Sequence, residues 1–191
     1  NIPLNTLTKT YDQMRYFRHL AMASVGGGYM SDYDVLPMIH KPTKSDNSQE
    51  NDGAFHSSRA ELPVDFSNDE EINIYNGFVP SLMSGSASKW ETLAFELLEN
   101  GAQHIDERMW TDMLAMLDLQ IENRGLFKSV DIVLNPIPLE KKWSERSCDA
   151  RRVYIAVHFS HHTFRESGVN IVNRAQIAKK WLEDWRSACQ S

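Results

Sequence analysis

The chain has 191 residues, of which 41% are hydrophobic, 10% aromatic and 24% charged, as is typical of a soluble globular protein. Its net charge of −6 disfavours a general nucleic-acid binder, because such proteins neutralise phosphates with an excess of Lys and Arg. No apolar run approaches the roughly 18 residues that span a bilayer, and the first residues do not resemble a signal peptide. We therefore expect a single domain over residues 1–191, without a membrane span, in the cytoplasm or within an intracellular assembly.

The two cysteines, Cys148 and Cys189, are separated by 41 positions. They form neither the multi-cysteine framework of a small secreted domain nor a CxxC metal motif. The sequence therefore predicts reduced thiols in a cytosolic compartment, and it predicts no cofactor and no metal.

The first periodic segment begins at Thr10, whose spacing to Gln13 is that of a capping box. Apolar residues then recur at helical spacing until three consecutive glycines, residues 26–28, which are expected to end the helix. These glycines follow a helix and precede no Lys-Ser/Thr pair, so they do not form a phosphate-binding loop.

An irregular acidic arm is expected over residues 32–71, where ten acidic residues face only three basic ones. Pro37 marks a short edge strand at its start, and residues 67–77 favour a short helical turn before Gly77. Residues 41–61 have almost no apolar content and predict a long loop. Since such a loop gains little from burial, we expect it to lie across another subunit or a basic partner. The candidate partner-binding residues are Lys44, Asp46, Glu50 and Asp52.

Two helices are expected next, over residues 88–101 and 104–124. Ser88 and Glu91 have capping-box spacing, and Asn100-Gly101 provides a stop signal. The second segment carries an apolar stripe that includes Met113 and Ile121, and it predicts a helix about 30 Å long. We interpret its acidic residues as a solvated face; they are Asp106, Glu107, Asp112, Asp118 and Glu122.

Two strand-like runs, residues 126–135 and 150–160, are expected to pair antiparallel. A last helix is predicted after Asn173, with an aromatic-rich face that includes Trp181 and Trp185. The expected fold is α+β, with about four main helices segregated from a small antiparallel sheet of two or three strands and with the acidic arm.

His158, His161 and His162 fall within five positions at the end of the second strand-like run. His158 and His161 point to opposite faces of an extended strand, and no nearby residues complete a zinc site at a familiar spacing. The favoured interpretation is that His158 is a half-buried strand residue and that His161-His162 begin a turn.

An alternative is enzymatic. The segment His158-Phe159-Ser160 is similar to the His-x-Ser/Thr motif of the two-histidine phosphodiesterases, which carry two copies on facing strands. The resemblance implies acid–base catalysis by His158 with Ser160, and by a second motif at His56 and Ser58 in the acidic arm. A further alternative is nucleic-acid binding through four basic residues, which are Arg151, Arg152, Lys179 and Lys180.

We favour a non-catalytic structural or assembly protein that acts through self-association or partner binding, such as a subunit of a viral or other large assembly. No catalytic template is recognised, and no catalytic residue is favoured outside the phosphodiesterase alternative.

Overall fold

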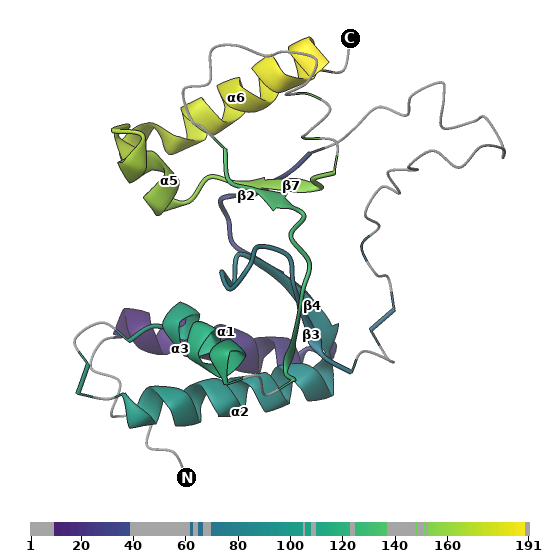
Figure 1. Cartoon of the computed structure of the whole chain (residues 1–191), viewed down its shortest axis with the longest axis vertical. Coiled ribbons are helices and arrows are strands. Elements are labelled where there is room, and N and C mark those ends of the chain that lie inside the picture. The colour runs from purple at the N-terminus through teal and green to yellow at the C-terminus, as the bar shows by residue number, and fades with distance from the viewer. Residues whose placement is uncertain are drawn as a thin grey trace, which may run out of the picture. The chain divides into compact units, whose positions relative to one another are not determined.

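The chain is α+β, as the sequence predicts. The computed structural model describes residues 10–38, 62, 65–66, 70–104, 106–107, 110–122, 125–136, 148, 151 and 153–189. The chain divides into two compact units (Figure 1). Unit 1 comprises residues 1–32 and 63–131, and unit 2 comprises residues 33–62 and 132–191.

Among its described residues, unit 1 combines three helices with a four-stranded mixed sheet. Its elements are α1 (Thr10–Ser24), β1 (Gly27–Ser31), β3 (Ile72–Ile74), β4 (Leu82–Ser86), α2 (Ala87–Gln103), α3 (Asp112–Ile121) and β5 (Phe127–Ser129). The strand order is β1-β4-β3-β5, in which β4 pairs antiparallel with β1 and with β3, while β3 and β5 are parallel.

The core of unit 1 forms where the apolar stripe of α2 meets the sheet and the other two helices. Trp90, Leu93 and Leu97 recur at helical spacing and are buried, and they join Ile74 and Met83 of the sheet in one cluster. The period of 3.6 residues places the α2 side chains on a single face, so that the helix covers the sheet with that face.

Gly27 begins β1 and is held in a conformation that other residues rarely adopt, with φ +88°. A Cβ atom at this position would lie 2.7 Å from the backbone nitrogen of Ala87 and 2.7 Å from the carbonyl oxygen of Gly85. The glycine therefore lets the chain leave α1 and pair closely with β4.

In the described part of unit 2, a three-stranded mixed sheet is accompanied by the helices α5 (His161–Glu166) and α6 (Arg174–Cys189) and by a 3-10 turn, η3 (Ile171–Asn173). The strands are β2 (Val35–Pro37), β6 (Val133–Leu134) and β7 (Ala156–His158). Figure 1 labels β2, β7, α5 and α6. The central strand β7 pairs antiparallel with β2 and parallel with β6.

The core of unit 2 is aromatic. Trp181 and Trp185 lie on one face of α6 and are buried against Phe159 and Phe164. The Phe159 ring meets the Trp181 ring edge-on, with the centroids 5.8 Å apart, which is a favoured geometry for aromatic pairs. The predicted aromatic face of the last helix is thus the face that packs on the sheet.

The strands differ from the prediction. Residues 72–74 form β3 rather than a helical turn, and β1 and β4 have no counterpart among the predicted strands. The run 126–135 divides into β5 and β6, which belong to the sheets of two different units, and both of them pair parallel. Partners distant in the sequence decided these pairings, which a period-two pattern does not reveal.

Two helix predictions were also wrong in detail. The helix predicted over residues 104–124 begins only at Asp112, because the Thr111 side chain caps it there by accepting from the Leu114 N–H. Ile121, assigned to its apolar stripe, is exposed, whereas Leu119 is buried. The preceding helix begins at Ala87 and continues past Gly101 to Gln103.

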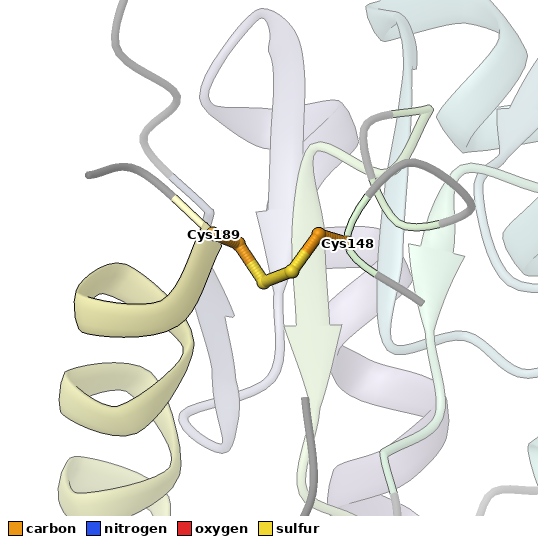
Figure 2. The surroundings of a disulfide bond; sticks show 2 residues. All are labelled: Cys148 and Cys189. Carbon is orange, nitrogen blue, oxygen red and sulfur yellow. A yellow bond between two sulfur atoms is a disulfide. The ribbon is translucent and has the colours of Figure 1, made fainter. Parts of the chain in front are cut away.

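Cys148 and Cys189 form a disulfide in unit 2 (Figure 2). This bond overturns the prediction of reduced thiols, which rested on cysteine count and spacing alone; the two Cα atoms lie 5.3 Å apart because the fold returns α6 to this point. Reduced thiols therefore no longer support the predicted cytosolic location. The helices that the structure describes are all too short or too polar to cross a membrane.

Candidate functional site

A pocket of about 650 Å³ opens along α6 in unit 2, and we call it the α6 pocket. Its apolar lining is contributed by Leu36, Phe159, Ile171, Val172, Ala175, Ala178 and Leu182. Its aromatic and charged lining is contributed by Tyr33, Asp34, Arg174, Lys179, Glu183 and Arg186. This volume is within the range of ligand pockets, and an apolar lining with a few convergent polar groups is typical of such sites.

The rim of the α6 pocket exposes large apolar groups. Tyr33 precedes β2 and is 85% exposed, and Val172 in η3 is 82% exposed. Exposed apolar groups that adjoin a concave apolar surface mark places where another molecule binds. These two residues would lose most of their exposed surface if a partner covered the pocket.

Arg174 begins α6 and makes the shortest polar contacts among the residues that line the pocket. Its Nη1 donates to Asp34 Oδ2 at 2.7 Å and to Tyr33 Oη at 2.7 Å, and its guanidinium lies 5.4 Å from the centroid of the Tyr33 ring. Its Nε is buried and has no hydrogen-bond partner among the described residues. Arg174 thus donates from Nη1 within unit 2 and leaves Nε unsatisfied.

His158, the residue on which the enzymatic alternative depends, lies on β7 and is 5% exposed. Its Nε2 is 3.4 Å from Asp34 Oδ1, and the other oxygen of that carboxylate accepts from Arg174. A carboxylate and an imidazole are metal-ligand types, but here Asp34 is engaged by a guanidinium as well. The arrangement is a row of Arg, Asp and His that ties α6 to the sheet.

The other residues of the phosphodiesterase alternative are not brought to this row in the described part of the chain. Ser160 caps α5, since its Oγ accepts from the Thr163 N–H at 3.1 Å. His161 and His162 begin that helix, not an isolated turn, and both are exposed. His56 and Ser58 lie outside the described residues, so the paired motif stays a prediction.

The basic residues of the nucleic-acid alternative are partly paired with acids. Lys179 lies 3.9 Å from Glu183, and Lys180 lies 2.8 Å from Asp184, each one helical turn along α6. Arg151 is described and half-buried, and Arg152 lies outside the described residues. The partner-binding candidates of the acidic arm, Lys44, Asp46, Glu50 and Asp52, lie outside them too.

Unit 1 contains a buried polar cluster around Asp112. Asp112 Oδ2 accepts from Arg18 Nη2 at 2.6 Å and from Arg18 Nε at 3.1 Å, and it lies 3.3 Å from His19 Nε2. Arg18 also donates from Nη1 to Asp32 Oδ1 at 2.7 Å. The prediction that Asp112 belongs to a solvated acidic face is wrong, because it begins α3 beside α1 and is 3% exposed.

Burial and pairing shift the pKa values of His19 and Asp112 in this cluster. Burial lowers the pKa of His19, and the hydrogen bond and charge of Asp112 only partly offset it. Burial would raise the pKa of Asp112, but the hydrogen bond from His19 and the charge of Arg18 bring it below its ordinary value. The cluster therefore holds a neutral imidazole and an ionised carboxylate.

The tautomer of His19 follows from the geometry of the cluster. A carboxylate can only accept, so His19 Nε2 carries the proton and Nδ1 does not. Nδ1 is buried without a partner in the described residues, and the ring stacks on Trp90 with the centroids 5.8 Å apart. Because no atom of His19 is open to a ligand, the cluster joins α1 to α3 rather than forming a reaction site.

The residues that line the α6 pocket were missed by sequence reasoning, apart from Lys179 in another role. Tyr33 and Asp34 were counted only as part of the acidic arm, and Arg174 was not singled out. Arg174 contacts Asp34 across 140 positions of the chain, so no local sequence pattern predicts this contact. One local signal was available, since the apolar pair Ile171-Val172 lies between Asn170 and Asn173, just before a predicted helix.

Comparisons with models of protein families, with curated proteins and with solved structures found no match for this chain.

Proposed function

We propose that this protein is non-catalytic and acts through self-association, with the α6 pocket as the contact that receives the partner copy. The observation that carries this proposal is the rim of the pocket, where Tyr33 and Val172 expose large apolar groups beside an apolar hollow. Apolar and aromatic anchors set in a hollow with a charged rim are characteristic of protein interfaces.

The charges of the pocket support binding rather than turnover. Asp34 is held by Arg174 at 2.7 Å, and Glu183 faces Lys179 at the longer distance of 3.9 Å on the exposed side of α6. The half-buried Asp34 also lies 3.4 Å from His158. A general base must reach a substrate proton, and these groups are directed at neighbours within unit 2.

The proposal also covers the cellular compartment in which the protein resides. Composition and cysteine spacing favour the cytoplasm or an intracellular assembly, whereas a disulfide such as Cys148–Cys189 persists most readily in an oxidising environment. We propose an oxidising compartment on that ground, and trapping of free thiols in the native source with an alkylating reagent tests it.

Sedimentation velocity of the full chain from micromolar to submillimolar concentration tests the function. We expect association that weakens in Val172→Asp, since a charge would be buried at the contact. Val153→Asp is the matched control, because Val153 is 47% exposed in the same unit and does not line the pocket. A chain that stays monomeric throughout this range, or Val172→Asp and Val153→Asp with equal effects, would contradict the proposal.

A further inference from the structure

The α6 pocket has a definite charge preference. Three cationic side chains line it, Arg174, Lys179 and Arg186, against the two carboxylates Asp34 and Glu183. The pair of Lys179 and Glu183 is long and exposed, so water screens it. No described acidic side chain pairs with Arg186. The pocket therefore favours an occupant that brings negative charge.

Arg174 makes this preference specific. Its Nη1 is held by Asp34 and Tyr33, while its buried Nε has no described partner. A buried donor without an acceptor destabilises the free protein. The edge of a guanidinium that presents Nε and Nη2 binds a carboxylate with two parallel hydrogen bonds. A small shift of Arg174 on binding would present that edge to an acidic group.

The walls of the pocket require an apolar group beside that carboxylate. Leu36, Phe159 and Leu182 line the pocket together with the exposed Val172. The occupant thus combines a large apolar side chain with nearby carboxylates. Within this chain, residues 44–58 have that composition: they carry Asp46, Glu50 and Asp52 against Lys44, and Phe55 is their large apolar residue. This segment lies outside the described residues.

We infer that the α6 pocket of one copy binds residues 44–58 of a second copy, with Phe55 against the apolar wall and the carboxylates towards Arg174 and Arg186. The inference rests on the proposed self-association and names the segment through which it occurs. Exchange of this segment between two copies closes a dimer, because each copy offers one pocket and one segment.

A fluorescently labelled synthetic peptide of residues 44–58, titrated with the full chain from which residues 44–58 are deleted, tests the inference. The deletion removes competition from the chain's own segment, and circular dichroism verifies that the deleted chain is folded. We expect saturable binding that loses at least about tenfold in affinity when Phe55 is replaced by Ser in the peptide. A peptide with Asn, Gln and Asn at positions 46, 50 and 52 should bind several-fold more weakly, and this difference should shrink at high salt.

Variants of the deleted chain locate the peptide. Arg186→Gln should weaken peptide binding several-fold, and Val172→Asp should weaken it further. Val153→Asp should leave the affinity for the peptide unchanged. Arg174→Lys keeps the charge but loses the paired donors, so it should weaken the acidic peptide more than the neutral one. Because Arg186 is exposed, its variant remains informative if Arg174→Lys does not fold.

The outcomes separate the inference from the proposed function. Association of the full chain that the deletion abolishes, together with peptide binding at the pocket, supports both. Association that survives the deletion, or a peptide that binds Val172→Asp as well as Val153→Asp, overturns the inference and leaves self-association standing. A chain that is monomeric both with and without residues 44–58 overturns both.

Discussion

His19 of α1 and Asp112 of α3 lie 93 positions apart in the chain, yet the imidazole Nε2 is 3.3 Å from the carboxylate Oδ2 inside unit 1. Arg18, the neighbour of His19, donates twice to the same oxygen. Unit 2 repeats this combination of residue types, where Asp34 lies between Arg174 and His158. In each unit, one carboxylate joins elements that are remote in the sequence.

Replacement of Asp112 by Ala should strongly destabilise unit 1. The change leaves the buried His19 without its acceptor and the half-buried Arg18 with Asp32 as its remaining carboxylate partner. Loss of one partner from a buried ion pair costs about 3–5 kcal/mol. Urea denaturation measures the free energy of unfolding, and hydrogen exchange of the α1 and α3 amides localises the loss. Asp106→Ala is the control, since Asp106 is an exposed acid of the same unit. Equal effects of the two changes would show that the cluster contributes nothing.

The stability of unit 1 should fall as the pH drops below about 6.5. The pKa of His19 is lowered in the folded protein from its ordinary value of 6.5, so the unfolded chain takes up a proton first on acidification. The stability that a neutral His19 provides is complete above that value, and it is lost from about pH 6.5 down to the folded pKa, by at most about 1.4 kcal/mol per pH unit. The lowered pKa of Asp112 adds a second loss as the pH falls through its ordinary value of 3.8.

Urea denaturation at a series of pH values between 8 and 5 checks this dependence, and the His19 ring resonances in NMR give its pKa directly. His19→Gln should flatten the dependence between pH 6.5 and 5, and His162→Gln, a change at an exposed residue of unit 2, is the control. A His19 that titrates above pH 6.5 in the folded protein would reverse the expected sign.

Reduction of the disulfide should destabilise unit 2. The bond closes a loop over a sequence separation of 41, and the loss of such a constraint on the unfolded chain corresponds to about 3–4 kcal/mol. Thermal unfolding with and without dithiothreitol measures the effect, and α6 should lose amide protection at its Cys189 end. The double variant Cys148→Ser, Cys189→Ser should resemble the reduced protein and no longer respond to reductant. Alkylation of both cysteines in the native, unreduced protein would refute the bond.

Gly27→Ala should cost more stability than Gly26→Ala. Both glycines have positive φ, +88° and +98°, so both changes carry the strain of a left-handed conformation, about 1–2 kcal/mol. Only at Gly27 would the new Cβ meet backbone atoms, at 2.7 Å, while at Gly26 it would find open space. We expect a further loss of about 1–3 kcal/mol at Gly27, from the forced separation of β1 and β4. Chemical denaturation of the two variants measures this difference, and equal losses would mean that β1 adjusts freely.

The helices with strong local patterns could be predicted from the sequence. In α6, Trp181 and Trp185 repeat at a spacing of four, and this spacing alone places both on one face. The end of α1 followed from three glycines, and the edge position of β2 followed from Pro37, which cannot donate to a neighbouring strand. The α+β class and these elements depend on backbone preferences and side-chain periodicity, which act over a few residues.

Tertiary structure decided what joins those elements. Ile72 and Ile74 have a spacing that either a short strand or a helical turn tolerates, and pairing with β4 and β5 selected the strand. Asp112 carries the same charge as exposed acids such as Asp106, and only the approach of α1 makes it a buried partner of Arg18. The disulfide and the α6 pocket likewise depend on residues brought together from distant parts of the chain. Contacts of this kind depend on the path of the whole chain, because packing and ion pairing act through space and not along the sequence.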